Sequence, residues 1–136
     1  MPSIFSKIIA GQIPGNFVFR SERWVALLDI RPTSPGHCLL IPLAEDQHFA
    51  DLPGATQTEL GLHLARLITA VKRVTGAPAV NVVLNDGPLA GQEVPHVHWH
   101  IVPRWPDDGR GFRFHPQPGA DLPAMAARLS AAWTAA

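Results

Sequence analysis

The chain has 136 residues, of which 46% are hydrophobic and 16% charged, and its 11 basic residues balance its 11 acidic ones. This composition predicts one soluble globular domain over residues 1–136, and zero net charge argues against nucleic acid or an anionic membrane as a partner. No apolar run reaches the roughly 18 residues of a membrane-spanning helix, no export signal is visible, and the single cysteine excludes an internal disulfide, so we expect a cytoplasmic protein.

The first part of the chain predicts one short helix and three strands. Strong turn formers separate these elements, with Gly11 after the helix and Pro35 and Gly36 before the third strand. The apolar patterns place the helix over residues 3–10 and the strands over 16–21, 24–30 and 37–42.

A long helix is the clearest element of the middle of the chain. Thr56 and Glu59 have the spacing of a capping box, so we expect this helix to begin at Thr56 and to end near Thr75, before Gly76. Its predicted apolar face consists of Leu60, Leu64, Leu67, Ile68, Val71 and Val74.

Two further strands are expected over residues 79–84 and about 97–103. The remainder, about 104–136, is predicted to be a loop rich in Pro and Gly followed by a short helix that Asp121 caps. Most strands are joined by short loops, which favours an α+β fold: a five-stranded, mostly antiparallel sheet with one long helix and short N- and C-terminal helices.

Three of the seven histidines alternate with apolar residues between Pro95 and Pro103. Successive side chains of a strand point to opposite faces, so His96, His98 and His100 are predicted to share one face. Such a row can offer an unprotonated nucleophile beside a proton donor near neutral pH, and it suits an anionic group such as phosphate.

Three interpretations of this row compete. A polar strand face that happens to use histidine is improbable at strict alternation. A zinc or iron site is possible for His-x-His on a strand, but no acidic residue follows closely, and Trp99 stands where a His-x-His-x-Asp-His pattern has its aspartate. We favour covalent phosphorus chemistry with histidine as the nucleophile.

The segment His96–Val102 fits the motif His-φ-His-φ-His-φ-φ (φ, apolar) at every position, and here the sequence resembles the histidine triad (HIT) family. It looks most like the small bacterial branch, closer to the Hint phosphoramidases than to the Fhit dinucleoside polyphosphate hydrolases. The resemblance implies a five-stranded sheet with two principal helices, and a homodimer formed through the long helix and the fourth strand. Further matching segments are Ile4-Phe5, Leu28–Ile30, Pro35–His37, Asn85–Gly87, Gly91-Gln92 and Pro103-Arg104.

The resemblance implies an enzyme that acts at the α-phosphate of a purine nucleotide, either a nucleoside phosphoramidate or a dinucleoside polyphosphate, and needs no cofactor. His98 would attack phosphorus to form a nucleotidyl-histidine, which water hydrolyses to release nucleoside monophosphate. His96 and His100 would bind the phosphate oxygens and the leaving-group side, and His37 matches an outlying fourth histidine. The alternatives are a nucleotide-binding sensor with incidental turnover and, less favoured, a metal-dependent hydrolase.

The resemblance also implies substrate contacts outside the histidines. Asp29 would accept hydrogen bonds from both ribose hydroxyls. A loop would hold the phosphate with backbone N–H groups and an amide, and Gly91 would let the backbone approach closely. The loop residues are Asn85, Gly91, Gln92, Glu93 and Val94, and the apolar slot for the base consists of Ile4, Phe5, Leu27 and Ile30.

Several positions depart from the family pattern. Many bacterial members begin Cys-x-x-Cys and hold a structural zinc, whereas Ser3 and Ser6 stand here, so we expect no metal although His48 stands where a third ligand is expected. Glu93 replaces a Ser or Thr near the leaving group, where a carboxyl could donate a proton or repel an anion. No role is assigned to His48, to His115 or to His63, which we expect at the surface or at a dimer edge.

Overall fold

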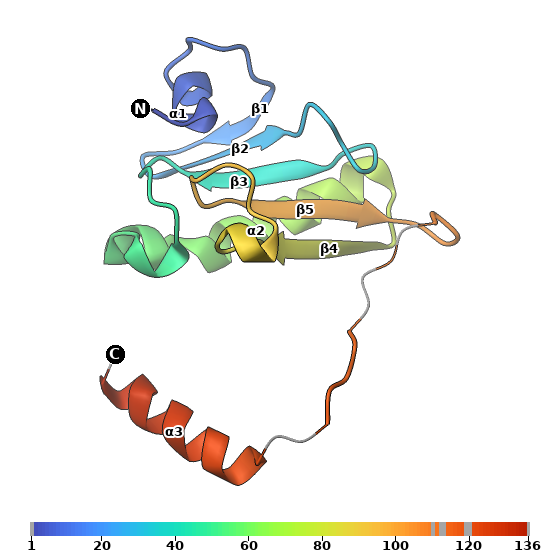
Figure 1. Cartoon of the computed structure of the whole chain (residues 1–136). Coiled ribbons are helices and arrows are strands. Elements are labelled where there is room, and N and C mark those ends of the chain that lie inside the picture. The colour runs from blue at the N-terminus through green and yellow to red at the C-terminus, as the bar shows by residue number, and fades with distance from the viewer. Residues whose placement is uncertain (1, 110, 112–113, 119–120, 136) are drawn as a thin grey trace.

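Five strands form one sheet in the order β1-β2-β3-β5-β4 in a computed structural model that describes residues 2–109, 111, 114–118 and 121–135 (Figure 1). Every pairing in the sheet is antiparallel. The strands span Phe17–Arg20 (β1), Trp24–Leu28 (β2), Cys38–Pro42 (β3), Ala79–Leu84 (β4) and Trp99–Arg104 (β5). The expected α+β fold is therefore confirmed, with strand ends that differ from the prediction by one or two residues.

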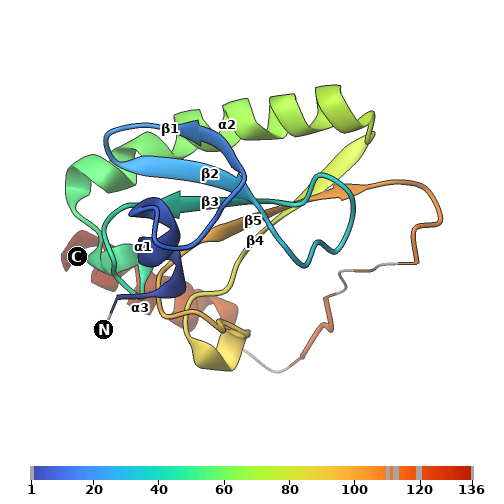
Figure 2. The ribbon, with the colours of Figure 1, turned by 90° about the horizontal axis from the view of Figure 1, so that it is seen from above.

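Two helices cover opposite faces of the sheet (Figure 2). The short α1 (Ile4–Ile9) packs on one face and the long α2 (Gly54–Thr75) on the other. Alternate residues of β2 serve the two faces: Trp24 and Ala26 belong to the core on the α2 side, and Val25 and Leu27 to the core on the α1 side. Because both faces are buried, β2 and β3 are apolar without interruption.

The start and the apolar face of α2 differ from the prediction. The helix begins at Gly54 after Pro53, so Thr56 is a buried residue inside the first turns and not a cap. Two short 3₁₀ helices, Phe49–Asp51 (η1) and Pro88–Ala90 (η2), were not predicted at all. Of the predicted face, Leu67 and Val71 are buried, whereas Val74, in the last turn of α2, is 85% exposed.

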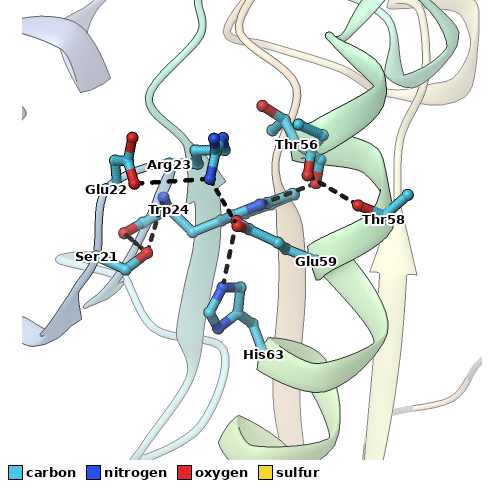
Figure 3. A network of polar contacts seen from close by, with 9 residues as sticks. Ser21, Glu22, Arg23, Trp24, Thr56, Thr58, Glu59 and His63 are labelled. Atoms are coloured by element: carbon cyan, nitrogen blue, oxygen red, sulfur yellow. Dashed lines mark hydrogen bonds and ion pairs between the residues drawn. The ribbon is translucent and has the colours of Figure 1, made fainter.

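His63 lies on the sheet side of α2, which corrects the expectation of a surface position, whereas the dimer-edge alternative stays a prediction. Its ring packs 5.1 Å from that of Phe19 and 6.1 Å from that of Trp24, and its Nε2 lies 3.8 Å from Glu59 Oε2. Figure 3 shows the surrounding network, in which the Trp24 indole N–H donates to the Thr56 carbonyl over 3.0 Å. His63 therefore has a packing role inside this chain, between α2 and the sheet.

The last helix, α3 (Leu122–Ala135), stands apart from the sheet in Figure 1. Asp121 caps it as predicted, because its Oδ1 accepts a hydrogen bond from the Ala124 amide over 3.1 Å. Neither core cluster includes an α3 residue, so the prediction that residues 1–136 form one domain stays a prediction. Within the described ranges no helix is long and apolar enough to cross a membrane. The large apolar side chains that α3 exposes are Leu122, Met125, Leu129 and Trp133.

Candidate active site

The histidine row begins before the last strand, not within it. β5 starts at Trp99, so His96 and His98 lie in an irregular segment that enters the strand, and only His100 belongs to the ladder. This segment is held from the loop after β3, where the Asp46 carbonyl accepts the Val97 amide over 2.8 Å. The ladder thus begins two residues later than expected. Of the three rings expected on one face, those of His98 and His100 lie with their centroids 5.0 Å apart.

His98 has one ring nitrogen engaged. Its Nδ1 lies 2.8 Å from the main-chain carbonyl oxygen of His96. A carbonyl only accepts, so Nδ1 carries the proton and donates, and the lone pair of a neutral ring is on Nε2. In the described part of the chain, Nε2 of His98 has no hydrogen-bond partner. A neutral imidazole with its lone pair free is a nucleophile.

His96 has both ring nitrogens engaged. Its Nε2 lies 2.7 Å from the Pro42 carbonyl oxygen and its Nδ1 lies 2.6 Å from Ser3 Oγ, and the side chain is fully buried. The ring therefore has no nitrogen left for a phosphate oxygen, which was its expected role. What His96 offers to the site is its carbonyl group, the acceptor for His98.

His100 and His37 form a hydrogen-bonded pair whose direction is fixed from outside. The Thr33 amide donates to His37 Nδ1 over 3.0 Å, so a neutral His37 carries its proton on Nε2. That nitrogen lies 2.9 Å from His100 Nδ1 and donates to it. The proton of His100 is then on its Nε2, where it can be donated to a bound anion.

Asp29 completes this cluster and raises the question of a metal. Its Oδ2 lies 3.6 Å from His37 Nε2, and single ligand atoms of Asp29, His37 and His100 all lie within 4.8 Å of one another. A metal ligand needs a lone pair, however, and a histidine that binds metal through Nε2 normally donates from Nδ1. Because the Thr33 amide donates to Nδ1 of His37, the donor set fits a chain of hydrogen bonds better than a metal ion.

Burial keeps these rings neutral. It lowers the pKa values of His37, His96 and His98, against the opposing effect of neighbouring carboxylates or carbonyls. The pKa of His100 falls to about 4, first through burial and then through the charges that His98 and His37 can carry. A neutral row holds an unprotonated nucleophile at neutral pH.

The expected base slot is brought together only in part. Phe5 and Leu27 are buried in the core on the α1 side, and the Phe5 ring meets that of His98 edge-on at 4.8 Å. Ile4 and Ile30 are 46% and 77% exposed. Through this ring contact, Phe5 packs α1 against the histidine row.

The loop before the row is held by its own side chains. The Gln92 side chain accepts the Gly87 amide over 2.8 Å and donates to the Gln47 carbonyl over 3.0 Å, so its amide braces the loop. Gly91 has φ +98°, a conformation that other residues adopt only with strain, and the Asn85 side chain lies next to it. Residues 86–90 line a hollow of about 410 Å³ beside this loop. Val94 packs on the α1-side core, while Glu93 is exposed, and its charge partly opposes the lowering of the His98 pKa by burial.

The residue that contacts Ser3 and Ser6 is Glu45, which was not predicted from the sequence, and not His48. Its Oε1 accepts hydrogen bonds from the Ser3 amide and, over 2.7 Å, from the Ser6 hydroxyl. His48 instead pairs with Asp86, 2.5 Å from Nδ1 to Oδ1. No motif marks a single glutamate as the partner of a helix start, so only the fold reveals it.

His115 is exposed, in a segment without regular structure.

Comparison with known proteins agrees with this architecture. The HIT domain model matches residues 10–107. An uncharacterized HIT-like protein of Methanocaldococcus jannaschii is 37% identical over 119 residues, which cover 88% of this chain and 92% of that protein. An adenosine 5′-monophosphoramidase of Schizosaccharomyces pombe is 33% identical over 133 residues, which cover 96% and 97%. The solved structure of a hypothetical protein from Leishmania major matches with a TM-score of 0.88 at 36% identity, covering 98% of this chain and 97% of that one.

The five-stranded fold with its three histidines and the matches to the family model and to these relatives show that the chain belongs to the HIT family. Its relatives come from archaea, yeasts and other lineages, so the narrower placement in a small bacterial branch stays a prediction.

Proposed function

We propose that this protein is a nucleotidyl hydrolase or transferase of the HIT type, which acts at the α-phosphate of nucleoside phosphoramidates or dinucleoside polyphosphates. The observation that carries the proposal is the 2.8 Å hydrogen bond from His98 Nδ1 to the His96 carbonyl, which leaves the Nε2 lone pair free. The name of the S. pombe relative, an adenosine 5′-monophosphoramidase, supports a purine nucleotide as substrate.

The reaction would proceed in two displacements. The Nε2 lone pair of His98 attacks the α-phosphorus, the bond from phosphorus to the leaving amine breaks, and the amine takes up a proton. Water then adds to phosphorus, the bond from phosphorus to Nε2 breaks, and the water proton is released with the nucleoside monophosphate. Imidazole suits both steps, because it is a good nucleophile when neutral and a good leaving group once attached to phosphorus.

The neighbouring groups would bind substrate. The Nε2–H of His100, held by His37, would donate to a phosphate oxygen or to the leaving group. The Asp29 carboxylate would accept the ribose hydroxyls, while the bond from the Arg31 amide to Oδ1, over 2.9 Å, holds the carboxylate in place. The loop Asn85–Val94 would contribute backbone amides, and Glu93 would face the leaving-group side.

We also propose a cytoplasmic homodimer formed through α2 and β4. β4 is an edge strand of the sheet, and unpaired apolar edges favour pairing with another chain. Val82 on β4 and Leu62 and Val74 on α2 are exposed apolar side chains on these same elements. The exposed apolar side chains of α3 would add to the area available for a second copy.

Replacement of His98 by Asn tests the proposal. The variant should lose turnover of adenosine 5′-monophosphoramidate while it still binds AMP in calorimetry, because the phosphate and ribose contacts remain. Turnover equal to that of the parent protein would overturn the assignment of the nucleophile. Loss of AMP binding with the fold intact by circular dichroism would give His98 a binding role instead.

A further inference from the structure

The start of α1 is bonded directly to the histidine row. Ser3 is the N-cap of α1, where its Oγ accepts the Ser6 amide over 3.1 Å. The same oxygen lies 2.6 Å from His96 Nδ1, across 93 positions of sequence. Capping requires only an acceptor, so the contact with His96 is additional to the role of Ser3 in the helix.

Counting protons fixes the direction of this contact. The Pro42 carbonyl can only accept, so His96 Nε2 carries the proton of the neutral ring. Nδ1 then has a lone pair, and the single hydroxyl proton of Ser3 is donated to it. The assignment agrees with the neighbours: Ser3 Oγ and Ser6 Oγ are 3.4 Å apart, and the Ser6 hydroxyl donates to Glu45 instead.

Glu45 holds Ser3 through a hydrogen bond from the Ser3 amide. Its carboxylate accepts from the Ser3 amide and the Ser6 hydroxyl, and these two bonds lower the pKa of Glu45 to about 2. Glu45 follows β3, the strand whose last residue, Pro42, accepts from the other side of the His96 ring. The ring is therefore held between α1 and the end of β3, and Phe5 of α1 covers it edge-on at 5.7 Å.

We infer that Ser3 is a positioning residue of the active site: its hydroxyl holds the His96 ring, and so sets the carbonyl that fixes the tautomer of His98. The inference rests on the proposed role of His98. It assigns to the N-cap of α1 a part in the reaction, although Ser3 touches no substrate. Without the Ser3 hydroxyl, Nδ1 of the fully buried ring would have no donor, which costs about 1–3 kcal/mol. A shift of His96 that relieves this cost would also move its carbonyl relative to His98 Nδ1.

Three substitutions at Ser3 distinguish its role as the helix cap from its role as the hydrogen-bond donor to His96 Nδ1. Ser3→Thr keeps both the cap and the hydroxyl and should keep kcat within about twofold. Ser3→Asp keeps a cap but brings a carboxylate that cannot donate, so His96 Nδ1 must take up a proton. Ser3→Ala removes both functions. For Asp and Ala we expect kcat to fall about ten- to hundredfold, as for small misplacements of a reacting group, with KM nearly unchanged.

Ser6→Ala is the matched control, because it removes a neighbouring hydroxyl that donates to Glu45 and not to His96. The bond from the Ser3 amide to Glu45 and the contact of the Ser3 hydroxyl with His96 remain in this variant. The direct readout is the ¹⁵N NMR signal of the imidazole rings. In the parent and in Ser6→Ala, His96 Nδ1 should appear as an unprotonated nitrogen and His98 Nδ1 as a protonated one. In Ser3→Asp, His96 Nδ1 should become protonated, and in Ser3→Ala the His98 signals should show both tautomers.

Unchanged His98 tautomers and unchanged kcat in Ser3→Ala, with the fold intact by circular dichroism, would overturn the inference. So would an equal loss of kcat in Ser6→Ala, because the effect would then belong to α1 as a whole. These outcomes differ from failure of the proposed function, in which His98→Asn retains turnover while the NMR signals of the parent remain as described.

Discussion

Nε2 of His37 lies 2.9 Å from Nδ1 of His100, although 63 positions separate them in the sequence. The Thr33 amide on the far side of His37 gives this bond its direction, so the His100 proton is on the nitrogen that remains. A main-chain amide thus sets the protonation of two rings in series. This chain of bonds is what a substitution at His37 would break.

His37→Leu should lower kcat, because His100 Nδ1 loses its donor and the His100 ring can then adopt either tautomer. We expect a fall of about tenfold or more. His37→Gln retains an N–H donor near the same place and should recover part of the loss. The measurement is steady-state hydrolysis of adenosine 5′-monophosphoramidate. His63→Gln is the control, since His63 also faces a carboxylate but lies on the α2 side of the sheet; an equal effect of this variant would contradict the account.

Activity should persist on the acid side of the ordinary histidine pKa. Burial lowers the pKa of His98 from its ordinary value of 6.5 and that of His100 to about 4, so both rings stay neutral to lower pH than a solvent-exposed imidazole does. The logarithm of kcat/KM should therefore be level at neutral pH and should decline at lower pH than the profile of a catalytic base with the ordinary histidine pKa of 6.5. A profile that already falls at pH 7 would show that the nucleophile is not shielded as described.

Stability should decrease as the medium is acidified. Histidines whose pKa is lower in the folded state than in the unfolded chain bind fewer protons when folded, so the free energy of unfolding falls from about pH 6.5 and stops falling near the folded pKa. For His100, with a folded pKa of about 4, the loss between these limits should amount to roughly 3 kcal/mol. Urea denaturation at pH 7, 6 and 5 measures it, and His100→Asn should show a smaller slope than the parent.

Gly36, which precedes His37, should tolerate no side chain. It has φ +92°, and a Cβ there would lie 2.5 Å from Thr75 Cγ2 at the end of α2. Gly76 has φ +73° with nothing within 4 Å, so it offers a control with strain but no clash. Gly76→Ala should cost about 1 kcal/mol of unfolding free energy, and Gly36→Ala about 2 kcal/mol or more. Equal losses in thermal or urea unfolding would mean that the contact with Thr75 relaxes freely.

The fold was largely predictable because its patterns are local. The capping side chain of α3 and the apolar runs of the strands depend on neighbours in sequence, so Asp121 and the five strands could be predicted. The start of α2 was misplaced because Thr56 satisfies a capping pattern, while in the structure its carbonyl accepts the Trp24 indole from another element. Tertiary contacts here override the local signal.

The residue types of the site could be predicted from the sequence, but the hydrogen-bond partners of each side chain could not. The motif marked His96, His98 and His100, yet alternation alone gave them equal roles on one face. The structure separates them, because Ser3 and Pro42 occupy both nitrogens of His96. These contacts join residues far apart in sequence, and hydroxyl, carbonyl and amide partners leave no pattern that a single sequence reveals.

The proposed homodimer can be tested at the two edges of the sheet. Val82→Glu places a charge on β4, and Val18→Glu places one on β1, where the parent side chains are 39% and 46% exposed. Light scattering with size exclusion should show a dimer for the parent and for Val18→Glu, and a shift toward monomer for Val82→Glu. A monomeric parent, or dissociation by the β1 variant alone, would contradict a β4 interface.

The stereochemical course at phosphorus tests the covalent route most directly. A single diastereomer of an adenosine phosphorothioamidate would be hydrolysed in ¹⁸O-water, and the configuration of the product phosphorothioate determined. Attack by His98 followed by attack by water inverts phosphorus twice, so we expect net retention in the product. Net inversion would mean that water attacks phosphorus directly, and His98 would then not be a nucleophile.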